Sequence, residues 1–177
     1  MHPFHTIGHS TRPLDELVDL LRAADITLLV DVRTVPRSRR NAQYNREVLP
    51  QSLTPFQIGY EHLPELGGLR SRQAGVPPSV NGYWQNESFH NYADYAMSDA
   101  FRAGLDRLRG LGHARRAAIM CAEALWWQCH RRIITDYLLA AGETVLHIVG
   151  PGKIEPAQIT DGARVGGAGI VTYPALL

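Results

Sequence analysis

Short, continuous apolar segments that alternate with amphipathic helical patterns constrain the fold of this chain more than any other feature. Four such segments lie at residues 4–8, 27–32, 117–122 and 144–149, and a weaker one lies at residues 58–63. Their hydrophobicity is continuous rather than alternating, which is typical of parallel strands that are covered on both faces. We therefore expect an α/β fold built on a mostly parallel sheet.

Three segments that follow these predicted strands have the periodicity of helices. In the first, Leu14 begins a stripe of leucine and valine, and Pro13 suits the first helical position. The same periodicity predicts helices over residues 91–111 and 129–141, with Gly142 placed to end the last one. Strands and helices that alternate in this way predict a doubly wound, Rossmann-like sheet.

Two segments interrupt the alternation of strands and helices. Residues 34–90 are rich in Pro, Gly, Asn and Arg, and Pro50 disfavours a helix over residues 45–55. We expect an elaborated loop region over the sheet there rather than a second domain. The tail, residues 151–177, is predicted to be irregular, with a short strand near residues 170–173. Because 177 residues suit one core, we predict a single α/β domain over residues 1–177.

The composition argues against several classes of function. The formal net charge of +1 gives no global reason to expect nucleic-acid binding. No uninterrupted apolar run is long enough to cross a bilayer, and the first residues, MHPFHTIGHS, lack the pattern of a secretory signal. We expect a cytoplasmic protein that does not associate with membranes. Lys153 is the only lysine, so the cations are arginines, whose forked guanidinium suits phosphate and carboxylate groups.

The carboxyl ends of the predicted strands carry unusual polar residues, and ligands of open α/β sheets bind beyond these ends. Our catalytic candidates are Asp31, Cys121, Glu123, Cys129 and His130. Our ligand-binding candidates are His9, Ser10, Arg12, Arg33, Ser38 and Arg131. Since these residues follow three different strands, a parallel sheet would collect them at one edge.

The segment MCAEALWWQCHR, residues 120–131, contains both cysteines and permits several interpretations. Cys121 and Cys129 could form a disulfide, which a reducing cytosol would make transient. Together with His130 they offer three ligands for a zinc ion, although two adjacent ligands on a helix diverge, unlike the usual spaced pairs. The segment could also be a polar cluster that only holds a loop to a helix.

The remaining interpretation is a catalytic site without a metal ion. Cys129, placed in the first turn of a helix, would feel the helix dipole and the nearby Arg131, and both favour a thiolate. Glu123 is the candidate general acid or base, because burial would favour its protonated form. His130 would move a proton and Arg131 would bind an anion. Asp31 has a structural alternative as the partner of Arg33.

Seven segments of the chain occur together, in this order, in a known family: TIGHSTR, LLVDVRTVPRSRRN, YEHLPELGG, NGYW, NYADYAM, MCAEALWWQCHRR and VTYP. Along nearly its whole length the chain resembles the bacterial and archaeal domain-of-unknown-function 488 family. The resemblance implies an α/β fold and a shared site, but no particular reaction. The positions that it assigns to the site are His9, Ser10, Asp31, Arg33, Pro36, Ser38, Leu66, Gly67, Cys121, Glu123, Cys129, His130 and Arg131.

These observations leave three functions open. The first is an enzyme, a hydrolase or a transferase, that acts on a phosphate-bearing ligand such as a nucleotide or a nucleic-acid component. The second is a non-catalytic module that binds a nucleotide or a nucleic acid through the arginine-rich loop at residues 37–40. The third is a metal-binding protein that uses Cys121, Cys129 and His130. No cofactor is implied by these patterns, and they do not predict an oligomeric state.

Overall fold

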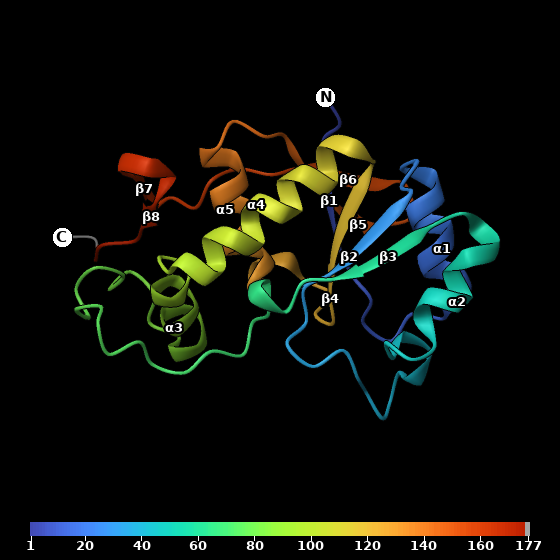
Figure 1. Cartoon of the computed structure of the whole chain (residues 1–177), viewed down its shortest axis with the longest axis horizontal. Helices are drawn as coiled ribbons and strands as arrows, with labels where there is room; N and C mark the ends of the chain where they lie inside the picture. Colours follow the sequence, from blue (N-terminus) through green and yellow to red (C-terminus); the bar gives the residue numbers. More distant parts are fainter. Residues whose placement is uncertain (176–177) are drawn as a thin grey trace.

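The computed structural model describes residues 1–175 and contains a six-stranded sheet in the order β3–β2–β4–β1–β5–β6 (Figure 1). The strands are β1 (Phe4–Gly8), β2 (Leu28–Asp31), β3 (Gly59–His62), β4 (Ala117–Cys121), β5 (Val145–Gly150) and β6 (Lys153–Pro156). The first five strands pair in parallel, and β6 pairs with β5 in the antiparallel direction. The predicted α/β domain with a mostly parallel sheet is confirmed.

Helices cover both faces of the sheet, which explains why its strands are apolar on both sides. Helices α1 (Leu14–Ala23) and α2 (Leu49–Leu53) pack on one face. Helices α3 (Glu87–Tyr95), α4 (Asp99–Ala114) and α5 (Arg131–Ala140) lie on the other side. Within β4 the side chains alternate, so that Met120 packs with α1 and Cys121 packs with the α4 and α5 cluster.

The ends of α1 and α5 follow from local chemistry. Pro13 precedes α1 as its cap residue, with φ −58° and ψ 150°, and so lies one position before the helical turn for which it was predicted. Gly142 ends α5 as predicted, in the left-handed region at φ +87°. There the Gly142 N–H bonds to the Leu139 carbonyl and the Glu143 N–H bonds to the Leu138 carbonyl, each at 3.0 Å. These two bonds satisfy carbonyl groups that the end of the helix leaves without partners.

The helix predicted over residues 91–111 is wrong, because this segment belongs to two helices. The chain leaves α3 after Tyr95 and starts α4 at Asp99. Ser98 separates them, since its backbone is extended and its side-chain oxygen accepts a hydrogen bond from the Phe101 N–H at 3.3 Å. Such a serine satisfies a backbone donor that the first turn of α4 would otherwise leave unpaired.

The segment over residues 34–90 is an elaborated region that contains short elements. A helix forms at α2 although Pro50 was predicted to disfavour one, because Pro50 lies in the first turn, where the missing N–H has no helical partner to lose. Three single turns of 3₁₀ helix lie at Ala42–Tyr44, Thr54–Phe56 and Pro64–Leu66.

The C-terminal tail is less irregular than predicted. A hairpin of β7 (Arg164–Val165) and β8 (Val171–Thr172) confirms the strand expected near residues 170–173. Strand β6 was missed, because all four of its residues are exposed and give no burial pattern. The last two residues of the predicted tail, 176 and 177, lie outside the described residues. Within residues 1–175, no helix has both the length and the apolar character needed to span a bilayer.

Candidate functional site

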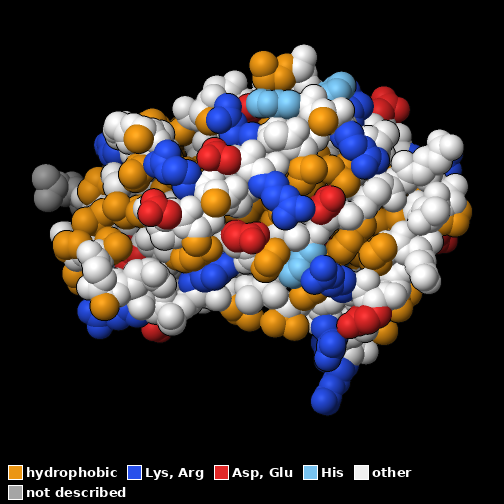
Figure 2. All heavy atoms as spheres, viewed as in Figure 1, with side chains coloured by type: hydrophobic (Ala, Val, Ile, Leu, Met, Phe, Trp, Pro, Cys, Tyr) orange, Lys and Arg blue, Asp and Glu red, His pale blue; other side chains and the backbone are white. Residues whose placement is uncertain are grey.

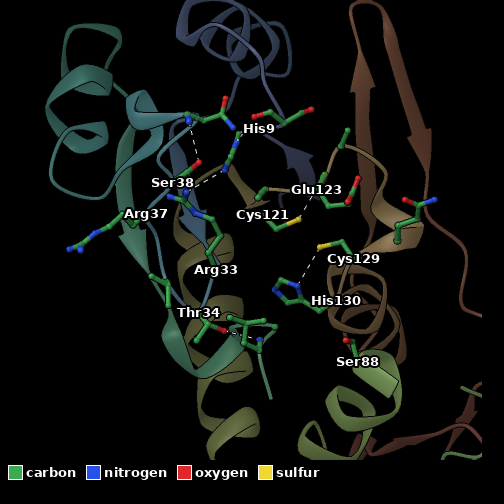
Figure 3. A pocket seen from close by; sticks show the side chains of 18 of the residues that line it. His9, Arg33, Thr34, Arg37, Ser38, Ser88, Cys121, Glu123, Cys129 and His130 are labelled. Carbon is green, nitrogen blue, oxygen red and sulfur yellow. Dashed lines mark hydrogen bonds between the residues drawn. The ribbon is translucent and has the colours of Figure 1, made fainter. Parts of the chain in front are cut away.

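The connections that leave the neighbouring parallel strands β1 and β4 run toward opposite edges of the sheet. After β1 the chain passes through α1 to β2 on one side, and after β4 it passes through α5 to β5 on the other side. The connections that follow two such strands diverge and leave a crevice beyond the carboxyl ends, which is where ligands of open α/β sheets bind. A cavity of about 580 Å³ lies at this point, a volume suited to a small molecule (Figure 3).

Segments that are far apart in the sequence form the wall of this cavity. The predicted site residues that line it are His9, Ser10, Arg33, Ser38, Cys121, Glu123, Cys129 and His130. Further lining residues include Thr34, Arg37, Arg40, Gly68, Leu69, Ser88, Phe89 and Gln128. The predicted residues Asp31, Arg12 and Arg131 lie behind the wall rather than in it.

Backbone contacts hold the ends of β1 and β4 together under the cavity. The His9 N–H bonds to the Cys121 carbonyl at 2.9 Å, and the Ser10 N–H bonds to the Ala122 carbonyl at 3.0 Å. The two segments approach so closely at Gly8 that an added Cβ would lie 1.8 Å from the Glu123 carbonyl oxygen. Ser10 adopts a left-handed conformation with φ +49°, which is a strained backbone for serine at the edge of a ligand cavity.

Asp31 is a structural residue of the site and not a free carboxylate. Its Oδ1 accepts a hydrogen bond from Arg33 Nε at 2.9 Å, and its Oδ2 accepts one from Arg33 Nη2 at 2.7 Å. The Tyr60 hydroxyl donates a further hydrogen bond to Oδ2 at 2.5 Å. The carboxylate is fully buried and its acceptors are occupied, which favours the structural interpretation over a catalytic one.

Arg33 retains one N–H group for a ligand. Its Nη2 bonds to both Asp31 and the Tyr44 carbonyl, and its Nη1 donates to His9 Nε2 at 3.3 Å. Together with Nε, four of its five donors are used. Among residues 1–175 the second Nη1 proton has no partner, although Arg33 is only 7% exposed and lines the cavity.

His9 is a neutral acceptor that orients Arg33. Its Nδ1 donates to the Ser10 carbonyl at 2.8 Å, so Nε2 carries the lone pair that Arg33 contacts. Burial, together with the charge of Arg33, lowers the pKa of His9 to about 4. The ring stacks on Tyr44 at 4.4 Å between centroids, which fixes its orientation.

Cys129 was predicted to lie in the first turn of a helix, but it lies just before α5. Its backbone is extended, with φ −133° and ψ 153°. Its sulfur nevertheless accepts a hydrogen bond from the Arg131 N–H at 3.4 Å, and its carbonyl accepts one from the Arg132 N–H at 2.9 Å. The thiol therefore acts as a cap at the positive end of the helix, which is the electrostatic effect that the prediction required.

His130 presents an unprotonated nitrogen to this sulfur. Its Nε2 donates to the Val32 carbonyl at 2.7 Å, which leaves Nδ1 as the acceptor, 3.3 Å from Cys129 Sγ. Burial lowers the pKa of His130 and keeps the ring neutral. Gly68 makes room for the ring, because a Cβ there would lie 2.5 Å from Nδ1. The geometry lets Nδ1 accept the proton of the thiol.

Arg131 supports the sulfur atoms instead of binding a ligand, so its predicted anion-binding role is not supported. Its Nε donates to Cys121 Sγ at 3.0 Å and its Nη2 donates to the Glu123 carbonyl at 2.6 Å. Its Nη1 donates to Thr6 Oγ1 at 3.2 Å. The side chain is 1% exposed and does not reach the cavity.

The two thiols differ in acidity because their surroundings differ. Burial opposes ionisation of Cys129 and is the largest single effect. However, a hydrogen bond from Cys121, the charge of Arg131 and the Arg131 N–H together outweigh burial and lower the pKa of Cys129 to about 7. For Cys121, burial and the hydrogen bond that it donates to Cys129 raise the pKa well above its usual value. The pair is thus arranged to ionise at Cys129.

Two further predicted residues have other surroundings than expected. Glu123 lines the cavity but is exposed, so the burial on which a general-acid role depended is absent. Its Oε1 accepts a hydrogen bond from the Leu125 N–H at 3.4 Å.

Arg12 holds the backbone at the end of β1, since its Nε donates to the Gly8 carbonyl at 3.2 Å and its Nη1 pairs with Glu16 at 2.7 Å. Its predicted ligand contact is not supported.

Sequence reasoning missed several residues of the site. Tyr60 lies in β3, and its hydroxyl donates a hydrogen bond to Asp31 in the neighbouring strand β2. No pattern in the sequence predicts this contact. Thr34 Oγ1 accepts a hydrogen bond from the Leu69 N–H at 2.9 Å, so its hydroxyl proton is available inside the cavity. Gly68, which lines the cavity, was also missed, although the resemblance assigns its neighbour Gly67 to the site. Two consecutive glycines were a usable signal, because they allow a close approach of the backbone to another group.

The structure argues against the metal-binding alternative. In the described part of the chain, residues 1–175, no three His, Cys, Asp or Glu side chains are arranged to hold a metal ion. The charge of Arg131 lies against both sulfur atoms, where it would repel a cation. Both cysteines are free thiols.

The fold and the cavity define a class: an α/β protein with a cysteine–histidine pair and a buried arginine at the switch point of its sheet. More specifically, the chain belongs to the family described as a domain of unknown function, DUF488, which matches residues 13–138, more than half of its length. The resemblance seen in the sequence is thereby confirmed. No curated protein and no solved structure has significant similarity to the chain.

Proposed function

We propose that the protein is an enzyme that binds a phosphate-bearing ligand, a nucleotide or a nucleic-acid component, and attacks it with the sulfur of Cys129. One observation carries the proposal. A thiol with His130 Nδ1 at 3.3 Å and a buried arginine N–H without a partner among residues 1–175 line the same cavity. A nucleophile, its base and an anion donor are the parts that such a reaction requires.

Anion binding is supported by donors on the side of the cavity opposite the sulfur. The free N–H of Arg33 is fixed by Asp31 and His9, so that a phosphate oxygen would meet it without reorganisation of the protein. The Thr34 and Ser38 hydroxyls each accept a backbone N–H, which leaves their protons for a ligand. Arg37 and Arg40 lie at the mouth and would attract the anion.

The proposed chemistry moves one proton and exchanges one bond. The Cys129 proton passes to His130 Nδ1 as the sulfur attacks phosphorus, and a sulfur–phosphorus bond forms while the bond to the leaving oxygen breaks. His130 then returns the proton to that oxygen. Water completes a hydrolysis and another acceptor completes a transfer. Glu123, exposed at the rim, would accept a hydrogen bond from the incoming molecule and orient it.

A non-catalytic binding module is the second candidate, and one observation favours it. Arg37, Arg39 and Arg40 are all exposed on the loop after β2. Figure 2 shows Lys and Arg side chains that project at the lower edge, where Figure 1 places this loop. An exposed arginine cluster of this kind binds polyanions through phosphate contacts that are sensitive to salt.

The test compares nucleotides and short oligonucleotides as ligands of the wild-type protein and of Cys129→Ser. We expect phosphate release from a nucleotide by the wild type and none by the variant, with a Kd within about threefold of wild type because serine keeps the shape. Cys121→Ser is the matched control, since it removes the neighbouring thiol and leaves the nucleophile. Equal turnover by Cys129→Ser would refute the proposal.

Salt dependence separates the two candidates. A module that binds single strands through its arginine loop loses affinity steeply with salt, by about 0.7 in the logarithmic slope for each phosphate contact. Arg37→Ala with Arg40→Ala would then lower the slope by about 1.4. Oligonucleotide binding with that behaviour, and no release of phosphate by any variant, would favour the module.

A further inference from the structure

We infer that Cys129 and Cys121 form an oxidisable pair: a hydroperoxide converts Cys129 to a sulfenic acid, and Cys121 then closes a disulfide with it. The inference concerns the two sulfur atoms and does not rest on the proposed substrate. It assigns a reversible modification to the wall of the cavity, with a small hydroperoxide as the reacting molecule.

The first support is the position of the two sulfur atoms. Figure 3 shows the two sulfur atoms pointing toward each other in the cavity wall, and the Cys121 thiol donates a hydrogen bond to the Glu123 carbonyl at 3.7 Å, in the loop that leads to Cys129. Arg131 contacts both atoms, through its backbone N–H at 3.4 Å and its Nε at 3.0 Å. The residues are 2% and 6% exposed, yet both line the cavity. A molecule the size of a hydroperoxide can therefore reach them, whereas a macromolecule cannot.

The second support is the difference between the two thiols, which assigns their order of reaction. Cys129 has an N–H donor and a neighbouring guanidinium, both of which favour its thiolate, and His130 Nδ1 lies 3.3 Å away, where it can take up the thiol proton. Cys121 ends a buried strand within the apolar cluster, and its surroundings keep it protonated. Since the thiolate is the species that attacks a peroxide, Cys129 reacts first and Cys121 resolves it.

The two steps balance in atoms and electrons. The Cys129 thiolate attacks the terminal oxygen of the hydroperoxide, the oxygen–oxygen bond breaks, and the leaving alkoxide or hydroxide takes up a proton. Cys129 loses two electrons and the peroxide gains two. The sulfur of Cys121 then attacks the sulfenic sulfur, the sulfur–oxygen bond breaks, and the departing hydroxide takes the Cys121 proton to form water. A thiol reductant reverses the modification.

Closing the bond requires the segment between the cysteines to move. Cys121 is held in β4 by its pairing with β1, so the movement falls on the loop. Ala122, Glu123, Trp127 and Gln128 in that loop are exposed, and its only regular element is the 3₁₀ turn Trp126–Gln128. A disulfide would draw Cys129 away from His130 Nδ1. Oxidation would therefore also remove the base from the nucleophile.

The experiment treats the full-length protein with hydrogen peroxide, alkylates the remaining thiols in denaturant and maps the peptides by mass spectrometry. We expect the wild type to lose both alkylatable thiols together, with a peptide linked between residues 121 and 129 and a monomer on a non-reducing gel. Dithiothreitol should restore both thiols. Two thiols that stay free, or a bond between two molecules, would overturn the inference.

Two matched variants test the order of reaction. Cys121→Ser should accumulate a sulfenic acid at Cys129 that the reagent dimedone traps, because no second thiol resolves it. Cys129→Ser should react with peroxide at least roughly tenfold more slowly, since Cys121 is protonated. If Cys121 in the Cys129→Ser variant were oxidised and labelled by dimedone as fast as the wild type reacts with peroxide, the assignment would be refuted. A disulfide that forms in a protein without phosphate release would uphold this inference and reject the proposed function.

Discussion

The acidity of Cys129 is the property on which both proposals depend, and the pH dependence of its alkylation tests it directly. With a pKa of about 7, half of the thiol is ionised at pH 7. An ordinary cysteine, with a pKa of about 8.5, is only about 3% ionised there. The thiolate of lower pKa is intrinsically less reactive by about fivefold over this interval. The net gain in rate at pH 7 is therefore only about threefold.

Because the rate changes so little, the midpoint of the pH profile is the decisive quantity. We expect the rate at which iodoacetamide labels Cys129 to have its midpoint near pH 7. Peptide mass spectrometry separates the labelling of Cys129 from that of Cys121. Arg131→Met removes the guanidinium but keeps the backbone N–H, so burial then dominates and the midpoint should rise above about 8.5. Arg131→Lys keeps the charge, so the midpoint of Cys129 alkylation should lie at a lower pH in this variant than in Arg131→Met.

Arg132→Met is the matched control for this experiment. Arg132 is the next residue of α5, and its guanidinium bonds to Thr160 Oγ1 at 3.2 Å rather than to a cysteine. Its replacement should leave the midpoint within about 0.3 pH units of wild type. Circular dichroism establishes that each variant is folded. A wild-type midpoint at 8.5 or above, or a midpoint that Arg131→Met does not move, would refute the electrostatic account of the site.

Three further outcomes follow from the contacts of the site. Asp31→Ala leaves a buried guanidinium without its counter-ion and should lower the free energy of unfolding by about 3–5 kcal/mol in urea titrations. Gly68→Ala places a Cβ 2.5 Å from His130 Nδ1 and should cost about 1–3 kcal/mol of stability and slow alkylation of the thiol. His9 and His147 have pKa values lowered by burial to about 4, so the unfolded chain binds their protons first. Stability should fall between about pH 6.5 and 4, by up to about 3 kcal/mol for each histidine.

The strands could be predicted from the sequence because burial on both faces leaves a simple pattern. Each end of the five parallel strands lies within one residue of its predicted position. Gly142 was readable for the same kind of reason, since only a residue without a side chain adopts its φ without strain. Strand β6 carried no such pattern, because it is exposed throughout.

The meeting of the candidate residues at one edge of the sheet could be predicted, whereas the contacts of the charged ones could not. Parallel strands bring their carboxyl ends to one edge, which places His9, Cys121 and the segment after β2 together whatever their side chains do. The partners of a guanidinium depend on distant residues. Arg33 and Arg131 look alike in the sequence, yet one keeps a donor for the cavity and the other uses its side chain on sulfur, a hydroxyl and a carbonyl.

The two buried arginines also differ in what balances their charge. Arg33 pairs with Asp31, but among residues 1–175 no carboxylate forms an ion pair with Arg131. A buried cation needs a compensating charge, and the thiolate of Cys129 is the anion in contact with its backbone N–H. Ionisation of the thiol should therefore stabilise the fold, in addition to activating the nucleophile.

This coupling predicts a specific pH dependence of stability. The pKa of Cys129 is lowered to about 7 in the folded protein and is about 8.5 in the unfolded chain, so the unfolded chain binds the proton first as the pH falls. The stabilisation is complete above about pH 8.5 and is lost as the pH falls through 7, a change of about 2 kcal/mol. Buried histidines act below about pH 6.5 and the raised pKa of Cys121 acts above 8.5, which leaves the interval between them to Cys129. Urea midpoints measured across that interval should rise with pH in the wild type and stay level in Cys129→Ser; equal slopes in the two proteins would show that the thiolate does not balance Arg131.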